Sequence, residues 1–219
     1  MTKAFSRVHE TIIFDGEGVV IDSEPIWDQS QREFLLRRGI AYDREKIKPL
    51  LAGRSLEDGV LVLQKQFHIP GDPAALARER MEIVRNLFEA EVQFVPGFLE
   101  FYRGVSPRYK TCVATVLSGE LLAIVTAKLN LTALFDSRIY NTEQTNLPSK
   151  PQPDVFLYAA RQLGSDPAQC IVIEDSPNGI QAALAAGMFT IALTTTFGPG
   201  QLQGADLIVN SFAEIQLPE

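Results

Sequence analysis

Acidic side chains follow two apolar segments of this chain, in a pattern that suits the binding of a divalent cation. Asp15 and Glu17 come directly after the apolar run TIIF. Glu174 and Asp175 end a second apolar run, CIVIED. Carboxylates brought together at one site repel one another unless a cation joins them. Oxygen ligands of this kind favour Mg²⁺, which keeps several waters and commonly bridges to a phosphate.

A hydroxyl and a lysine add the features that a phosphate would need. Thr115 ends a third apolar run, and Lys150 stands before a Pro-x-Pro entry to a helix. A phosphate dianion beside Asp15 needs compensation from both a metal and a cation such as Lys150. Each residue alone has an ordinary explanation, since Thr115 can cap a turn and Lys150 can be a surface lysine. Together with the acids they indicate a phosphate site.

The histidines and cysteines do not indicate a zinc site. His9 and His68 are isolated in the sequence, so we expect solvated or structural side chains. Cys112 and Cys170 lie in apolar, strand-like runs and are predicted to be buried free thiols.

Short apolar runs and helical stretches alternate along most of the chain. The runs that predict strands are residues 11–14, 111–115, 137–141, 170–175, 189–194 and 206–210. Apolar residues at three- and four-residue spacing predict helices at 119–135, 153–164 and 178–188. We therefore expect an α/β fold with a doubly wound, Rossmann-like parallel sheet. Ligands of such sheets bind beyond the carboxyl ends of the strands, which is where the acids would meet.

One region interrupts this alternation with helices alone. Amphipathic patterns at 23–39, 56–67 and 73–92 are separated by Gly and Pro breaks. The sequence therefore predicts a core of residues 1–22 plus 97–219 and an inserted all-α cap domain of residues 23–96, placed as a lid over the sheet.

Composition limits the partners of the protein. The net charge is −7 over 219 residues, which argues against a nucleic-acid binder. The first residues lack the apolar core of a signal peptide, and no apolar run approaches the ~18 residues that span a bilayer. We expect a cytoplasmic protein, a monomer or weak dimer, that contacts neither nucleic acid nor membrane.

Four motifs in order resemble those of the haloacid dehalogenase superfamily. They are FDGEGVVIDSE, VAT at the end of a strand, SKPQPDVF and IVIEDSPNGIQAALAAG. The resemblance covers essentially the whole chain, and the helical insertion matches the family's first-position cap. The motifs are most similar to those of sugar-phosphate phosphatases and β-phosphoglucomutase-like members. The resemblance implies a Mg²⁺-dependent phosphatase that acts on a small phosphorylated metabolite, a sugar or sugar-alcohol phosphate.

The resemblance also implies roles for the catalytic residues. Asp15 would be the nucleophile that forms an aspartyl-phosphate. Glu17 would be the general acid and base. Thr115 would hydrogen-bond the transferring phosphoryl group, and Lys150 would neutralise charge beside it.

The same resemblance implies a metal site. Asp15, Asp175 and the backbone carbonyl of Glu17 would bind Mg²⁺, and Glu174 would lie in or beside its water shell.

Glu17 departs from the usual Asp-x-Asp motif. Glutamate is one methylene longer, a displacement of roughly 1 Å, and misplacement of that size can cost ~10²-fold in rate. Enolase-phosphatase members carry Asp-x-Glu here, so the substitution is compatible with catalysis. A weakly active or inactive ligand-binding module is the alternative. Trp27 stands where the mutases have a histidine, which favours hydrolysis over a phosphohexomutase activity.

Three residues of the insertion are candidates for substrate binding. They are Glu24, Trp27 and Arg54. Trp27 could equally pack within the cap, and Arg54 could be an ordinary surface arginine. The sequence leaves both alternatives open.

Two other enzyme classes fit less well. A haloacid dehalogenase proper would use the same aspartate without a metal and would not need Glu174 and Asp175. A nicotinamide dehydrogenase would need a glycine-rich turn after its first strand, where this chain has an acid.

Overall fold

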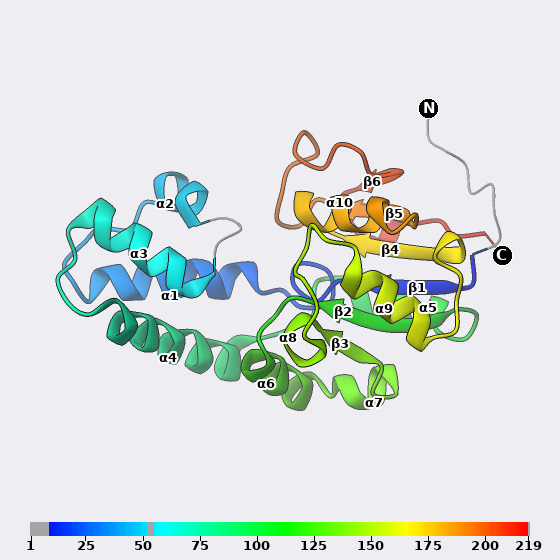
Figure 1. Cartoon of the computed structure of the whole chain (residues 1–219), viewed down its shortest axis with the longest axis horizontal. Coiled ribbons are helices and arrows are strands. Elements are labelled where there is room, and N and C mark those ends of the chain that lie inside the picture. Colours follow the sequence, from blue (N-terminus) through cyan, green and yellow to red (C-terminus); the bar gives the residue numbers. More distant parts are fainter. Residues whose placement is uncertain (1–8, 52–54, 219) are drawn as a thin grey trace. The chain divides into compact units, whose positions relative to one another are not determined.

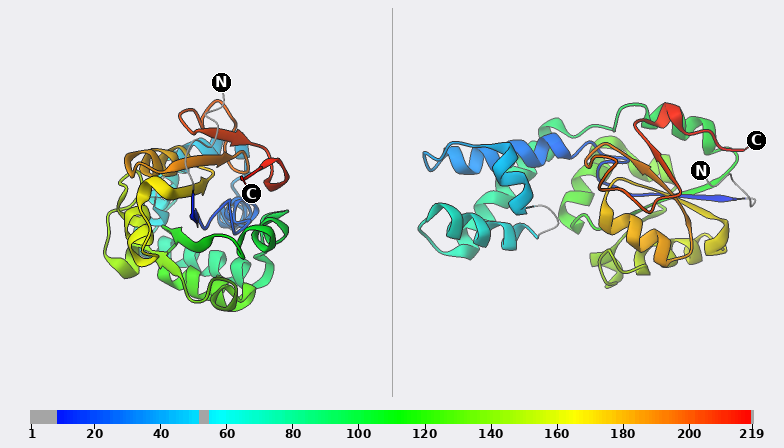
Figure 2. Two further views of the ribbon diagram at one scale, coloured as in Figure 1. Left: turned by 90° about the vertical axis from the view of Figure 1, so that its right-hand side faces the viewer. Right: turned by 90° about the horizontal axis from the view of Figure 1, so that it is seen from above.

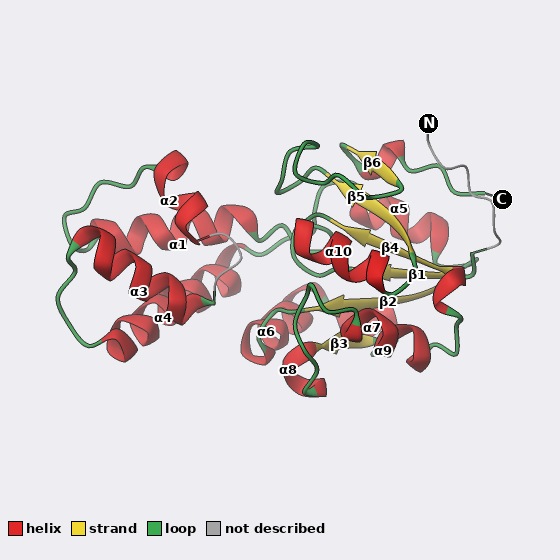
Figure 3. Ribbon diagram, turned by 45° about the horizontal axis from the view of Figure 1, so that its top comes forward, coloured by secondary structure: helices red, strands yellow, loops and turns green. Residues whose placement is uncertain are grey.

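The computed structural model describes residues 9–51 and 55–218. The chain divides into two compact units. The larger comprises the described residues up to Asp22 together with those from Gln93 onwards, and the smaller runs from Ser23 to Val92. All strands assigned in the described residues belong to the larger unit, whereas the smaller contains helices and loops (Figure 3).

A parallel sheet forms the centre of the larger unit (Figure 1). Its strands within the described residues are β1 (Thr11–Phe14), β2 (Lys110–Thr115), β3 (Ile139–Asn141), β4 (Cys170–Glu174), β5 (Phe189–Leu193) and β6 (Leu207–Val209). They lie in the order β3-β2-β1-β4-β5-β6, and every pair is parallel. The α/β prediction is therefore confirmed. The order changes direction between β1 and β4, which is where doubly wound sheets bind ligands.

Helices cover both faces of this sheet (Figure 2). They are α5 (Phe98–Val105), α6 (Gly119–Leu129), α7 (Leu131–Phe135), α8 (Thr142–Thr145), α9 (Asp154–Gln162) and α10 (Pro177–Ala185), with 3₁₀ turns η1 (Pro167–Gln169) and η2 (Phe212–Glu214). The helix predicted at 119–135 is interrupted, because Asn130 adopts a left-handed conformation with φ of 53° and ends α6.

Successive residues of β1 face opposite sides of the sheet, as the strand periodicity requires. Ile13 packs in a cluster with residues of α9 and α10. Phe14 lies on the other face, where its ring contacts Phe98 of α5 at a centroid distance of 5.5 Å and Phe135 of α7 at 6.0 Å. Both β1 side chains are fully buried. Helices therefore pack against β1 from both faces of the sheet and hold the strand in place. The acidic motif begins at the next residue, Asp15.

The smaller unit consists of helices. They are α1 (Glu24–Leu36), α2 (Arg44–Leu51), α3 (Leu56–Phe67) and α4 (Pro73–Glu91). Asp72 caps α4 by accepting a hydrogen bond from the backbone N–H of Ala75, and Ser55 caps α3 through Asp58 in the same way. The apolar stripes of α1, α3 and α4 are buried within this unit. The role of these helices as a cap stays a prediction.

Two segments of the larger unit lie side by side where the chain leaves it and returns. Ile21 and Phe94 form an antiparallel bridge, and the backbone N–H of Asp22 donates to the carbonyl of Gln93 at 3.0 Å. The backbone N–H of Val95 donates to the carbonyl of Val20 at 3.1 Å. The sequence prediction placed this return at residue 97, a few residues later along the chain.

Both cysteines are buried free thiols, as predicted. Cys112 lies on β2 and Cys170 on β4, the two strands that flank β1. Among the described residues, none of the helices combines the length and the apolar composition that crossing a bilayer requires.

Candidate active site

Asp15 lies immediately beyond the carboxyl end of β1, at the switch point of the sheet. Its backbone N–H donates to the carbonyl of Ile173 at 2.9 Å and so extends the pairing between β1 and β4 by one residue. The residue is only 5% exposed. Burial raises the pKa of the Asp15 carboxyl to about 7, and the charge of Glu174 adds to that rise while Lys150 opposes it.

Lys150 joins two of the acids. Its Nζ donates hydrogen bonds to Asp15 and, at 2.7 Å, to Oε1 of Glu174. The same atom lies 4.8 Å from the ring centroid of Phe156 on α9. Burial alone lowers the pKa of Lys150, but the adjacent carboxylates outweigh it and the pKa rises above its ordinary value. The lysine therefore stays charged between its two partners.

Glu174 uses both of its carboxylate oxygens. Oε1 accepts from Lys150, whereas Oε2 accepts from the backbone N–H groups of Asp175 at 2.8 Å and Ser176 at 2.7 Å. The hydroxyl of Ser176 donates to Oε2 as well, at 2.9 Å. Gly179 makes room for this carboxylate, since a Cβ at that position would lie 1.7 Å from Oε1. Glu174 thus joins the segment between β4 and α10 to Lys150.

Asp175 completes a cluster of three buried carboxylates. One oxygen each from Asp15, Glu174 and Asp175 lies within 4.8 Å of the others. Burial raises the pKa of Asp175 well above its ordinary value, and the charges of Glu174 and Asp15 raise it further. Lys150 pairs with two of these three carboxylates, so the described part of the site keeps negative charge that a divalent cation would balance. Oxygen donors of this kind suit Mg²⁺, so these residues fit the predicted ion.

Glu17 lies half-buried in the loop that follows Asp15. The loop is held by its own backbone, because the carbonyl of Gly16 accepts from the N–H groups of Val20 at 2.9 Å and Ile21 at 2.8 Å. The side chain of Glu17 is outside the three-carboxylate cluster. Its predicted metal contact uses the backbone carbonyl, so that role and the acid–base role both stay predictions.

Thr115 lies at the carboxyl end of β2 and is fully buried. Its hydroxyl oxygen accepts a hydrogen bond from the backbone N–H of Leu117 at 3.1 Å, which leaves its own hydrogen free to donate. A Cβ built on Gly16 would lie 2.6 Å from this oxygen. The structure therefore brings Thr115 directly against the residue that follows Asp15.

Two candidate substrate-binding residues have partners within the helical unit. Glu24 accepts from Arg44 at 2.8 Å and from Lys48 at 2.5 Å. Trp27 is half-buried and packs edge-on against Phe88 of α4, with ring centroids 5.9 Å apart. Arg54 lies outside the described residues. Substrate binding by these three residues stays a prediction.

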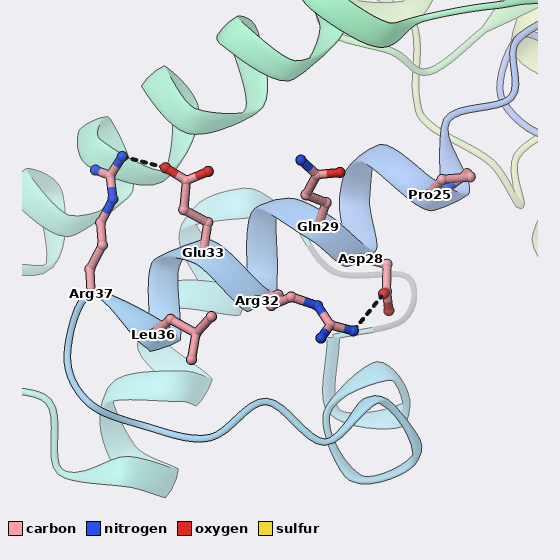
Figure 4. A pocket seen from close by; sticks show the side chains of 7 residues that line it. All are labelled: Pro25, Asp28, Gln29, Arg32, Glu33, Leu36 and Arg37. Carbon is pink, nitrogen blue, oxygen red and sulfur yellow. Dashed lines mark hydrogen bonds and ion pairs between the residues drawn. The ribbon is translucent and has the colours of Figure 1, made fainter.

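A hollow of about 640 Å³ is lined by side chains of α1 and by Arg37, which follows it (Figure 4). Its charged side chains pair along the same helix, with Arg37 donating to Glu33 at 2.5 Å and Arg32 lying 4.0 Å from Asp28. Its lining includes none of the predicted site residues. Because its charges already compensate one another, this hollow is a weaker candidate than the carboxylate cluster.

Comparison with known proteins agrees with this geometry. A family model described as haloacid dehalogenase-like hydrolase matches residues 12–193. The chain belongs to this family. The predicted family, and with it a hydrolase, is therefore confirmed.

Several members of the haloacid dehalogenase-like family are similar over most of the chain. Fructose-1-phosphate phosphatase YqaB of Escherichia coli (strain K12) is 33% identical over 178 residues, covering 81% of this chain and 92% of that protein. Hexitol phosphatase B of the same strain is 30% identical and covers 83% and 82%. A crystal structure of a family hydrolase from Deinococcus radiodurans R1, with bound phosphate and sodium, is 29% identical with a TM-score of 0.80, covering 94% and 93%.

Some residues that hold this candidate site together were missed by the sequence prediction. The hydroxyl of Thr195 donates to the carbonyl of Gly18 at 2.6 Å, and the hydroxyl of Thr196 lies beside Asp175 and lowers the pKa of its carboxyl. Ser176 and Phe156 support Glu174 and Lys150 as described above. The threonines directly follow the apolar run 189–194, so a hydroxyl at the end of a predicted strand was the available signal.

Proposed function

We propose that this protein hydrolyses a phosphate monoester of a small metabolite, a sugar or sugar-alcohol phosphate, through an aspartyl-phosphate on Asp15. The observation that carries the proposal is the buried carboxylate of Asp15, held by Lys150 beside Glu174 and Asp175 at the switch point of the sheet. Three segments of the sequence, at residues 15, 150 and 174–175, meet there, and Thr115 lies against Gly16 beside them. Such a grouping suits phosphoryl transfer to a carboxylate.

Asp15 is the proposed nucleophile. One of its oxygens attacks the phosphorus of the ester, and the bond between phosphorus and the alcohol oxygen breaks. Glu17 gives its proton to the departing alkoxide. Water then attacks the phosphorus of the aspartyl-phosphate, its proton returns to Glu17, and the Asp15 carboxylate and inorganic phosphate are released.

Lys150 and Thr115 serve the same reaction without bonding covalently to the substrate. The ammonium of Lys150 keeps Asp15 oriented and offsets charge on the incoming phosphoryl group. The hydroxyl hydrogen of Thr115, which its bond from Leu117 leaves free, can donate to a phosphoryl oxygen.

Mg²⁺ is the cofactor that this donor set fits. Asp15, Asp175 and the backbone carbonyl of Glu17 would hold it, with Glu174 beside it. When bound, the ion supplies positive charge that offsets the negative charge of the carboxylates and of the phosphoryl oxygens. Both oxygens of Glu174 already accept hydrogen bonds, which supports a place for it next to the ion rather than among its direct ligands.

The relatives support the substrate class. Two proteins at 30% identity or more are named as a fructose-1-phosphate phosphatase and a hexitol phosphatase. The solved hydrolase with bound phosphate supports a phosphate site in this fold. Sugar and sugar-alcohol phosphates are therefore the first compounds to test.

The test is phosphate release by the purified full chain from a panel of hexose, pentose and hexitol phosphates. We expect turnover with Mg²⁺, none with excess EDTA, and none for Asp15→Asn at an unchanged melting temperature. Release of halide from a haloacid in EDTA, or conversion of a hexose phosphate to its isomer without phosphate release, would contradict the proposal. Tight ligand binding without turnover of any phosphoester would indicate a binding module instead.

A further inference from the structure

Three consecutive threonines follow β5, and their hydroxyl groups have three different neighbours. Thr194 donates outward to Oδ1 of Asn210 at 3.1 Å. Thr195 donates to the carbonyl oxygen of Gly18 at 2.6 Å, across 177 positions of sequence. The hydroxyl of Thr196 lies beside the carboxylate of Asp175, since a Cβ on Gly18 would lie within 3 Å of both, and it lowers the pKa of that carboxyl. Two of the three hydroxyls therefore reach the candidate site, and the third does not.

The sheet explains why this loop reaches the site. β5 lies beside β4 in parallel register, with Glu174 opposite Ala192. The chain that leaves β5 after Leu193 therefore emerges next to Asp175, which leaves β4. The backbone N–H of Thr194 still pairs with β6 through the carbonyl of Val209 at 3.0 Å. Only beyond Thr194 is the loop free to turn toward β1 and β4.

Gly18 lies where the loop after β1, the loop after β5 and Asp175 come together. It adopts a left-handed conformation with φ of 69°. A Cβ at this position would lie 1.8 Å from Oδ2 of Asp175 and 2.8 Å from Oγ1 of Thr196. A side chain here would therefore displace Asp175, Thr196 or both. The loop that carries Glu17 thus passes directly against the proposed metal ligand.

Asp175 has little else to fix its orientation. Lys150 donates to Asp15 and Glu174 rather than to Asp175. Glu174 and Asp15 both carry charge of the same sign as Asp175 and lie close to it. Without a donor of its own, this carboxylate would turn away from its neighbours. Among the described residues, the hydroxyl of Thr196 lies beside Asp175 and favours its charged form, because it lowers the pKa of that carboxyl.

We propose that Thr196 and Thr195 are positioning residues that form one clamp. Thr196 sets the rotation of the Asp175 carboxylate so that one of its oxygens faces the metal position. Thr195 holds the carbonyl of Gly18 and thereby fixes the loop on which Glu17 lies. The inference thus has two parts, one for Thr196 at Asp175 and one for Thr195 at Gly18. The part for Thr196 rests on the proposed function only because it takes Mg²⁺ as the metal. Groups that orient metal ligands in this way typically change metal affinity 10–100-fold when lost.

The first test measures Mg²⁺ binding to the full chain by isothermal titration calorimetry, without substrate. Thr196→Val should raise the Kd for Mg²⁺ by roughly 10-fold or more. Thr196→Ser should restore it, because serine keeps the hydroxyl. Thr194→Val is the matched control: it removes a hydroxyl from the same loop, and the Kd should not change.

Three results would overturn the role of Thr196 in positioning Asp175. They are an unchanged Kd for Thr196→Val, an equal loss for Thr194→Val, and a wild-type chain that binds no Mg²⁺. A wild-type chain that binds Mg²⁺ but releases phosphate from no ester is a different outcome. It would overturn the proposed function. The Kd values of the Thr196 variants would still decide whether Thr196 positions Asp175.

The second test follows hydrogen exchange of the loop amides. Thr195→Val should speed exchange of the Gly18, Val20 and Ile21 amides about fivefold or more, as expected for the loss of one hydrogen bond. Thr195→Ser should exchange like the wild type, and Thr194→Val should leave these amides unaffected. Unchanged exchange in Thr195→Val would show that the loop keeps its conformation without the Thr195 hydroxyl. That result would overturn the role of Thr195 in positioning the loop.

Discussion

Glu174 and Lys150 are joined inside the protein by a hydrogen bond of 2.7 Å, and the side chains of both are at most 5% exposed. The other oxygen of Glu174 accepts from two backbone N–H groups and one hydroxyl at the start of α10. This carboxylate therefore connects a strand end, a helix start and the lysine that holds Asp15. Its loss should affect stability as well as activity.

Glu174→Gln should lower the free energy of unfolding by about 2–3 kcal/mol. An amide offers one acceptor oxygen where the carboxylate has two, so either Lys150 or the backbone N–H groups of Asp175 and Ser176 lose a charged partner. Urea denaturation measures the change. Glu143→Gln is the control, because Glu143 is exposed and accepts from one backbone N–H, that of Gly119. Equal effects of the two substitutions would contradict this account of Glu174.

Gly179→Ala should be far more harmful than an alanine at an open glycine. The new Cβ would lie 1.7 Å from Oε1 of Glu174, so the carboxylate must move away from Lys150. We expect a loss of about 1–3 kcal/mol in stability together with reduced turnover. Gly200→Ala is the control, since no atom of the described residues, apart from its chain neighbours, lies within 4 Å of its added Cβ. Its melting temperature should match the wild type. A Gly179→Ala protein with wild-type stability would show that Glu174 can relax without cost.

Arg80→Met should stabilise the protein. Arg80 lies on α4 and is 3% exposed, yet its Nε has no hydrogen-bond partner among residues 9–51 and 55–218. Burial lowers the pKa of Arg80 to about 10, because it disfavours the charged form. Methionine keeps much of the length without the charge, so the free energy of unfolding should rise by roughly 1–3 kcal/mol.

The control for Arg80 lies on the same helix. Arg78 is exposed, so Arg78→Met should change stability by less than about 0.5 kcal/mol. Thermal or urea unfolding compares the two variants. A less stable Arg80→Met protein would mean that the guanidinium stabilises the helical unit despite its unpartnered Nε.

Glu17→Gln should lower kcat by roughly 10²–10⁴-fold, since the amide cannot donate a proton to the leaving group. The Kd for Mg²⁺ should change little, because the proposed contact uses the backbone carbonyl of residue 17. Glu17→Asp keeps an acid and should retain more activity than Glu17→Gln. Steady-state kinetics and calorimetry separate the two roles. Equal kcat for the Gln variant and the wild type would remove Glu17 from the mechanism.

The sequence predicted the class of the fold because the relevant signal is local. Continuous apolar runs identified the strands, and the helical spacing between them implied a parallel sheet. It did not single out α2 at residues 44–51, a short charged segment that contains Pro49, or α5 at 98–105. It also missed the break at Asn130, because a left-handed residue inside an apolar pattern leaves that pattern intact.

The candidate site was predictable as a set of residues but not as a set of contacts. Asp15 and Lys150 are 135 positions apart, and the motifs indicated both. The motifs did not show that Glu174 is occupied on both oxygens, nor that Gly16 and Gly179 leave room for Thr115 and Glu174. Those facts depend on which strands become neighbours.

By itself the sequence determined the family, the strand-and-helix order and the side chains that can carry the chemistry, because residue type and spacing encode these locally. Tertiary structure alone decided that β5 lies beside β4, and so that Thr195 and Thr196 meet Gly18 and Asp175. Lateral strand order follows from how helices pack on both faces of the sheet. That packing depends on the whole chain at once, so no single segment records it.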